Sequence, residues 1–317
     1  MTDSQHAIRA GQPVLAPSQA APRRKRFGEK ERFMFFLIAP AAILLFLFQV
    51  LPIAMGLNVS FRDWMLTNPK KTWIGLDHYA SVLADPVFIG KVLPNTFLFM
   101  FGSVSLSLCL GLAVALMLNR GLKGQKLIQT VLLLPLMVAP VIAAIMMRWM
   151  FNDQFGIVNI ALQALGVDPP AWLTQQWTAF LVILLTDVWL WTPWFCLLLL
   201  AALQSLPKEP FEAAEIDGAS RWRVFRYLTI PMLRPVIVVC VVIRMIDAFR
   251  TFDIVWTLTG GGPARATELF SLYAYINAFQ NLNFGRGSAA SMIGAFVIVV
   301  TGAILFRVMT RLTKPAV

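Results

Sequence analysis

Charged and aromatic side chains interrupt one of the long apolar runs of this sequence. The run contains Asp187, followed by Trp189, Trp191 and Trp194. An ionisable group inside an apolar run is costly unless it is paired or hydrated, and it therefore marks a candidate functional site. The carboxylate can accept hydrogen bonds from hydroxyl groups, and the indole rings can stack on a sugar ring. The alternative is structural, with the tryptophans in an aromatic belt and Asp187 paired with Arg244.

A second apolar run carries Arg244, Asp247, Arg250 and Asp253 at steps of three residues. Successive members of this row can form ion pairs along a helix, and structural pairing is the first interpretation. The alternative is that some of them line a water-filled pathway, where the two arginines would suit a solute with a sulfonate or phosphate group. The candidate pathway residues are therefore Asp187, Trp191, Trp194, Arg244, Asp247 and Arg250.

These residues belong to a chain that is far more apolar than a soluble domain. Of its 317 residues, 58% are hydrophobic and 14% are charged, and the mean hydropathy is +0.70. Six continuous apolar runs are long enough to cross a bilayer as helices, which satisfy their own backbone hydrogen bonds in lipid. The runs are residues 33–58, 94–118, 127–150, 178–203, 235–258 and 288–310. The sequence predicts an all-α membrane protein with about six transmembrane helices.

Basic residues are spread unevenly over the connections between these runs. The N-terminal tail, the 119–126 connection, the loop after the fourth run and the C-terminal end hold most of the 27 Lys and Arg residues. By the positive-inside rule, we expect both termini in the cytoplasm. The net charge of +11 follows from this bias and suits anionic lipid headgroups, not nucleic acid. We expect a disordered basic tail (1–32), a transmembrane domain (33–310) and a short cytoplasmic C-terminus (311–317).

Several smaller features add expectations about shape. Pro135 and Pro140 inside the third run suggest a kinked helix around a pathway, or a bend that only shapes packing. Segment 268–280 has apolar residues at helical spacing and predicts an interfacial helix. Aromatic residues in the first and third outward loops, such as Trp73 and Phe284, could form a cap on the outer face.

The sequence offers little support for enzyme chemistry. The two histidines, His6 and His78, lie in the tail and in an outer loop, apart from any set of metal ligands or acid–base partners. The three cysteines, Cys109, Cys196 and Cys240, all fall inside apolar runs, and we interpret them as small packing residues. We therefore predict no catalytic residue and no metal site.

The polar loop after the fourth run has the composition of a helical hairpin. Pro210 suits a first helical turn, Glu212 complements the positive end of the helix dipole, and Gly218 offers a stop. Ser220 can cap a second helix, which we expect to end at Pro231. From these residues alone, a docking surface and an ordinary loop are equally supported.

A motif in this hairpin resembles the EAA loop of ABC importer permeases. The family pattern has Glu-Ala-Ala, three residues, Gly, nine residues and then Ile-x-Leu-Pro. This chain has Glu212, Ala213 and Ala214, then Gly218, then residues 228–231 as Leu-Thr-Ile-Pro. The longer string resembles the carbohydrate-importer branch, the MalF- and UgpA-like permeases, and the resemblance extends along most of the chain after the tail.

The resemblance implies the type I architecture of ABC importer permeases and a transport subunit that works by alternating access and is not an enzyme. It also implies that the EAA loop, about residues 205–235, is a coupling helix that docks on a separate ATPase subunit. The implied coupling residues are Glu212, Ala213, Ala214, Asp217 and Gly218. The sequence has no G-x-x-x-x-G-K-[ST] phosphate loop, in agreement with ATP and Mg being bound by the partner ATPase subunits and with no cofactor in this chain.

The resemblance further implies a second permease subunit as heterodimer partner, two ATPase subunits, an extracellular or periplasmic solute-binding protein, and a place in the bacterial inner membrane. The implied solute is a sugar or sugar derivative, with glycerol phosphate, a polyol or a sulfonated sugar as alternatives. A secondary transporter or a membrane-embedded enzyme is the rival of a different class. A secondary transporter would usually show internal repeats and would not need the hairpin.

Overall fold

The computed structural model describes residues 29–67, 70–121 and 124–313, which divide into two compact units at residues 53 and 54. In the first unit, α1 (Glu29–Leu45) leads into a π-helical turn (Phe46–Val50), and α2 (Leu51–Ser60) begins in this unit and continues into the second. These segments confirm the first predicted span as a helix. Most of the predicted disordered tail, residues 1–28, lies outside the described residues, and α1 already includes the last part of it.

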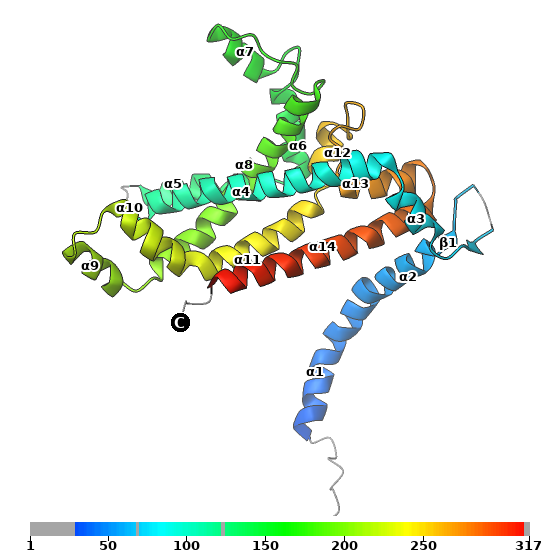
Figure 1. Ribbon diagram of the computed structural model, residues 1–317, viewed down its shortest axis with the longest axis horizontal. Helices are drawn as coiled ribbons and strands as arrows, with labels where there is room; N and C mark the ends of the chain where they lie inside the picture. The colour runs from blue at the N-terminus through cyan, green and yellow to red at the C-terminus, as the bar shows by residue number, and fades with distance from the viewer. Residues whose placement is uncertain (1–28, 68–69, 122–123, 314–317) are drawn as a thin grey trace, which may run out of the picture. The chain divides into compact units, whose positions relative to one another are not determined.

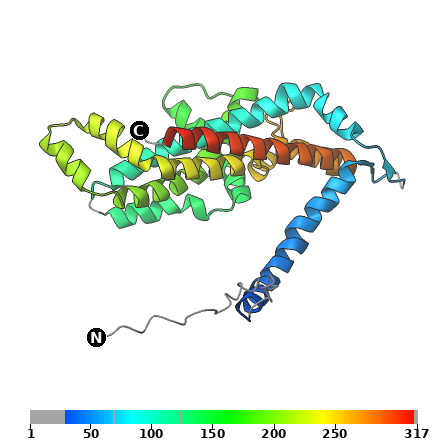
Figure 2. The ribbon, with the colours of Figure 1, turned by 60° about the horizontal axis from the view of Figure 1, so that its bottom comes forward.

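Long helices that lie side by side form the second unit (Figures 1 and 2). They are α4 (Leu93–Leu118), α8 (Gln176–Gln204), α11 (Ile230–Phe249) and α14 (Phe284–Thr313). Helix α4 packs along α8, and α11 contacts α4, α8 and α14. A further π-helical turn, η2 (Phe88–Val92), precedes α4. The core between these helices is apolar, with Phe99, Leu199 and Leu233 completely buried.

The third predicted span is broken and is not a single helix. It consists of α5 (Gln125–Leu133), a 3-10 turn (Pro135–Met137) and α6 (Pro140–Met150), and its two halves are bent by 96°. The described residues therefore contain five helices that could cross a membrane, or six if the bent pair counts as one. The prolines explain the bend, because a residue before proline avoids the helical region and Ala139 is accordingly extended. Pro140 then begins α6, a position that proline favours.

The fifth predicted span also ends earlier than expected. Helix α11 stops at Phe249, and a separate short helix, α12 (Asp253–Leu258), follows after a non-helical link. The prediction of one helix through residue 258 was wrong, because it joined the apolar residues on both sides of Arg250 and Thr251, which lie in the non-helical link. An acidic residue in the first turn of α12, Asp253, suits a new helix start. Asp253 therefore does not share a helix with Arg244.

The prediction that the hairpin's second helix ends at Pro231 was also wrong. The helix runs from α10 (Arg221–Val224) through a π-helical turn, η4 (Phe225–Thr229), directly into α11. Pro231 is the second residue of α11 and directly follows this π turn, so its missing N–H falls inside a continuous helix. The N–H of Ile230 bonds to the carbonyl of Phe225, so the wider π turn absorbs the irregularity.

Connecting segments of the second unit contact one another. Strands β1 (Arg62–Asp63) and β2 (Thr72–Trp73) pair antiparallel, and the Trp64 ring packs 5.8 Å from the Phe284 ring at the start of α14. The first and third of the predicted outward loops therefore touch, as a cap would require. Other connecting elements are α3 (Asp77–Leu83), which includes a buried His78, and α7 (Ile157–Ala164).

The segment predicted as an interfacial helix is helical but belongs to the core. It forms α13 (Phe270–Tyr275) and the π-helical turn η5 (Ile276–Gln280), and both Leu272 and Tyr273 are buried.

Of the three cysteines, which are all free, Cys196 and Cys240 are buried as packing residues should be, whereas Cys109 is exposed.

Candidate functional site

The helical hairpin projects beyond the ends of α8 and α11 (Figure 1). Its first helix, α9 (Glu209–Ile216), has Pro210 in its first turn, as predicted. The helix ends just before Gly218, whose φ of +69° is in the left-handed region that glycine adopts without strain. The N–H of Ala219 then bonds to the carbonyl of Ala214 at 2.9 Å, which closes the helix end. Ser220 accepts a hydrogen bond from the N–H of Arg223, so the predicted cap of the second helix is present.

The hairpin presents apolar side chains to its surroundings. Ile216 is 87% exposed and Trp222 is 65% exposed, although both are large hydrophobic residues. The resemblance-implied coupling residues lie on α9 and the turn that follows it, and all except the half-buried Ala214 are exposed. An exposed apolar surface with small alanines between larger side chains is typical of a protein-binding site.

A buried ion pair joins α8 to α11 at the other candidate site. The Arg244 guanidinium donates to the Asp187 carboxylate, and each side chain is only 1% exposed. Ser103 of α4 also donates to this carboxylate. Arg244 reaches Asp247 as well, with 3.0 Å between Nη1 and Oδ2. The structural alternative for Asp187, pairing with Arg244, is therefore confirmed.

Two adjoining cavities lie beside this ion pair. The aspartate cavity, of about 340 Å³, is lined by Pro140, Asp187, Trp191, Asp247, Arg250, Thr251, Phe252, Asp253 and Ile254. The tryptophan cavity, of about 330 Å³, is lined by Trp191, Trp194, Ile243, Arg244, Ile246, Asp247 and Arg250. The structure thus brings all six candidate pathway residues to one region between α8 and α11.

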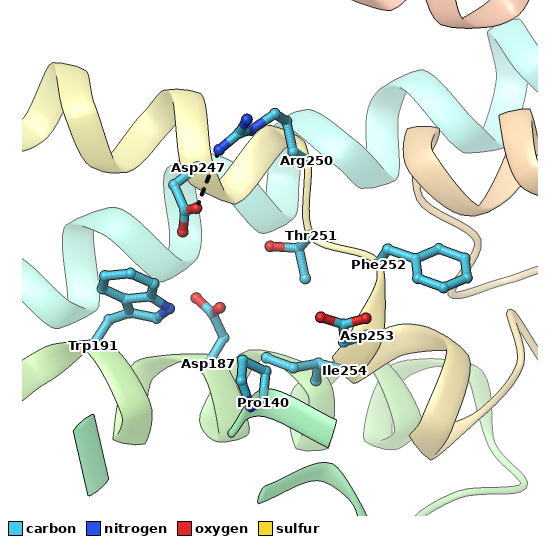
Figure 3. Close-up of a pocket in the computed structure, with 9 residues that line it drawn as sticks. All are labelled: Pro140, Asp187, Trp191, Asp247, Arg250, Thr251, Phe252, Asp253 and Ile254. Carbon is cyan, nitrogen blue, oxygen red and sulfur yellow. Dashed lines mark ion pairs between the residues drawn. The ribbon is translucent and has the colours of Figure 1, made fainter. Parts of the chain in front are cut away.

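The carboxyl groups of Asp187, Asp247 and Asp253 all face the aspartate cavity, whereas the Phe252 ring points away from it (Figure 3). Arg250 closes one side and lies 3.7 Å from Asp247. Among the described residues, Asp253 has no ion-pair partner, so its carboxylate is available to the cavity. The cavity is therefore a polar space within a bundle of apolar helices.

The tryptophans of α8 do not act as one group. Trp191 and Trp194 are nearly perpendicular, with ring centroids 6.1 Å apart, and the Arg244 guanidinium lies 4.5 Å from the centre of the Trp191 ring. Trp189 faces a different, apolar hollow of about 690 Å³, which also includes Leu110 and Val131. Only Trp191 and Trp194 are thus placed to meet a solute in the polar cavities.

From the sequence we did not expect Ser103 beside the ion pair, Thr251 on the wall of the aspartate cavity or Asp253 facing that cavity. Ser103 carries no signal of its own, because a small hydroxyl residue in an apolar helix is ordinary packing material. Asp253 was visible as the end of the charged row, but the break after Phe249 turns it toward the cavity from a second helix.

Long apolar helices around a polar cavity, with an exposed hairpin at one end, are the features of a membrane transport subunit. The chain belongs to the binding-protein-dependent transport system inner membrane components, whose family model matches residues 107–317. It is therefore a permease subunit of an ABC importer and not an enzyme.

Relatives of known role span nearly the same length. The trehalose/maltose transport system permease protein MalF of Thermococcus litoralis is 39% identical over 86% of this chain and 91% of its own. The trehalose permease protein SugA of Mycobacterium tuberculosis is 37% identical, covering 83% and 84%. The sulfoquinovosyl glycerol permease protein SmoG of Agrobacterium fabrum is 35% identical, covering 86% and 88%.

The fold is similar to that of a solved transporter. A chain in the crystal structure of a bacterial ABC transporter involved in import of the acidic polysaccharide alginate superposes with a TM-score of 0.79. It is 26% identical, and the match covers 90% of this chain and 97% of that one. A second structure of an alginate transporter, in complex with a pentasaccharide-bound periplasmic protein, gives a TM-score of 0.78.

Proposed function

We propose that this permease imports a sugar or sugar derivative, and that the aspartate and tryptophan cavities are part of its solute pathway. The observation that carries the proposal is a space between two apolar membrane helices whose wall combines tryptophan rings with charged side chains. Carboxylates accept hydrogen bonds from sugar hydroxyls, and indole rings offer flat apolar surfaces to a sugar ring. The printed roles of the relatives, trehalose, maltose and sulfoquinovosyl glycerol transport, support the same solute class.

The charges around the cavities favour a neutral sugar. Arg244 is neutralised by Asp187 and Asp247, so it has little charge to offer a solute. Together the two cavities have three carboxylates, those of Asp187, Asp247 and Asp253, against the guanidinium groups of Arg244 and Arg250. An anionic group would meet this excess of negative charge, and only Arg250, which is 69% exposed, is open to receive it.

Uptake by the complete transporter tests both points. Cells that express the chain with its partner subunits are given labelled trehalose, with sulfoquinovosyl glycerol as competitor. We expect the wild-type transporter to take up trehalose and the sulfonated solute to compete weakly. Uptake should fall in Arg250→Ala, because this residue borders both cavities. Normal uptake by Arg250→Ala at wild-type protein levels would remove the pathway assignment, and strong competition would remove the neutral-sugar preference.

We also propose that the hairpin is the docking site for an ATPase subunit. The exposed Ile216 and Trp222, with Ala213 between larger side chains, support this role. The complete importer then contains a second permease, two ATPase subunits that bind ATP and Mg, and a solute-binding protein at the outer face. Both termini of this chain lie in the cytoplasm of a bacterial cell.

Copurification and reporter fusion test this arrangement. A tagged chain should bring down an ATPase subunit from detergent-solubilised membranes, and a reporter fused after Val317 should be active only in the cytoplasm. Recovery without any ATPase, or a reporter that is active outside the cytoplasm, would contradict the proposal.

A further inference from the structure

The buried group around Arg244 connects three helices at a single point. Arg244 belongs to α11, its partner Asp187 belongs to α8, and Ser103 of α4 donates to the same carboxylate and lies 3.4 Å from an Arg244 nitrogen. No other described ion pair has both side chains buried to 1% exposure. We call these three residues the clamp.

The clamp resists separation of the helices for an electrostatic reason. A charge inside a bundle of apolar helices is tolerated when its counter-charge is in contact, and breaking the pair leaves two uncompensated charges. Sliding α11 along α8 would break the pair, whereas moving α4, α8 and α11 together would keep it. The three helices are therefore constrained to move as one body at this depth.

The clamp lies at the cavities, far from the hairpin along both helices. Helix α8 leads into the hairpin at Gln204, and the return helix runs without a break from Arg221 to Phe249. Along these two helices, Asp187 lies roughly 25 Å from Gln204 and Arg244 lies roughly 35 Å from Arg221, at 1.5 Å of helix rise per residue. Asp187 and Arg244 also line the aspartate and tryptophan cavities, respectively.

We propose that Arg244 is a positioning residue that makes α4, α8 and α11 a single lever, through which movement of the hairpin changes the shape of the aspartate cavity, whose other wall includes Pro140 of α6 and Ile254 of α12. Asp247, which Arg244 also contacts, is 37% exposed and faces both cavities, so the guanidinium connects the lever to the cavity wall. The inference rests on the proposed pathway and adds the mechanical connection to it.

The test follows the accessibility of the aspartate cavity through the ATP cycle. Thr251→Cys places a thiol on the cavity wall, and Cys109→Ser removes the exposed native thiol. The complete complex, in proteoliposomes, is treated with a membrane-impermeant maleimide, without nucleotide and after trapping with ATP and vanadate. With the native clamp, we expect the labelling rate to change several-fold between these two states.

Two clamp variants make the prediction specific. Asp187→Leu/Arg244→Leu removes both charges, so no unpaired charge remains buried. Arg244→Lys keeps the charge but lacks the forked donors that reach Asp187 and Asp247 together. We expect both variants to copurify with an ATPase subunit, which the hairpin binds, and to lose the ATP-dependent change in labelling. If Asp187→Leu/Arg244→Leu does not assemble, Arg244→Lys still tests whether the clamp is needed for the change in labelling.

The outcomes separate this inference from the proposed pathway. An unchanged labelling difference in either assembled variant would overturn the clamp and leave the pathway standing. A Thr251→Cys thiol that is never labelled in the native-clamp protein would overturn the pathway assignment, and the inference with it.

Discussion

Arg286 forms an ion pair with Asp85 at 2.8 Å, which links the start of α14 to the segment before α4. The Tyr273 hydroxyl of α13 donates to the same carboxylate oxygen at 2.8 Å. Three segments that are far apart in the sequence therefore meet at one carboxylate.

This carboxylate should make stability depend on acid pH. Partial burial acts to raise the pKa of Asp85, but the Tyr273 hydroxyl, the Val87 N–H and the Arg286 charge outweigh it, so the pKa lies below its usual value. A lowered folded-state pKa gives stability above the unfolded value, near pH 4, that is lost as pH falls through the folded value. We expect Asp85→Asn to lower stability by about 2 kcal/mol at neutral pH.

Thermal unfolding of the solubilised protein measures this effect between pH 7 and pH 3. The difference between wild type and Asp85→Asn should shrink below about pH 4, where the wild-type carboxylate becomes protonated. A difference that stays constant down to pH 3 would contradict the assignment of the acid sensitivity to Asp85.

Gly111 should be intolerant of even one added methyl group. A β-carbon there would lie 2.5 Å from the Phe195 Cβ and 3.0 Å from the Cys196 nitrogen, so α4 and α8 would have to move apart. We expect Gly111→Ala to destabilise the protein by roughly 1–3 kcal/mol, as overpacking does. Gly90→Ala is the matched control because its β-carbon would meet nothing within 4 Å. Equal melting temperatures for the two variants would show that the helices are not in close contact at Gly111.

Substitutions at Gly218 should be tolerated according to how well the new residue adopts the left-handed backbone region. Its φ is +69° and its surroundings are open, so a substitution acts through the backbone alone. Asn tolerates this region better than Ala, which loses roughly 1–2 kcal/mol there. The amount of copurified ATPase should fall in the order Gly, Asn, Ala, Val. Gly166→Ala carries the same strain at φ +74° outside the hairpin, and its ATPase recovery should equal that of wild type.

Neighbouring tryptophans of α8 should differ in their effect on transport. Trp191 borders both the aspartate and the tryptophan cavity, and losing a ring contact of about 1 kcal/mol in Trp191→Leu should raise the apparent KM for the transported sugar roughly fivefold. Trp191→Phe keeps an aromatic face and should be intermediate. Trp189→Leu is the control. Trp189 faces the apolar hollow, so this substitution should leave the KM unchanged. Equal effects at both positions would indicate a general packing role for these side chains.

Features that depend only on residues close together in the sequence could be predicted. The positions of the apolar helices follow from local hydropathy, and the hairpin follows from the local backbone preferences of Pro210, Gly218 and Ser220. The end of α11 could not be predicted, because apolar residues resume after Arg250 and Thr251 and the row of charges continues at helical spacing to Asp253. The absence of a break at Pro231 depended on the π turn before it, which no local preference indicates.

The sequence by itself determined that this chain is a membrane protein with an EAA-type hairpin, because apolar length and capping chemistry act over a few residues. Only the tertiary structure decided the surroundings of Asp187. Its partners Arg244 and Ser103 are 57 and 84 residues away, and their meeting depends on how three helices are rotated and packed. Helix rotation is set by the whole core, so the same six candidate residues were equally compatible with a belt, a set of ion pairs or a cavity wall until the helices were assembled.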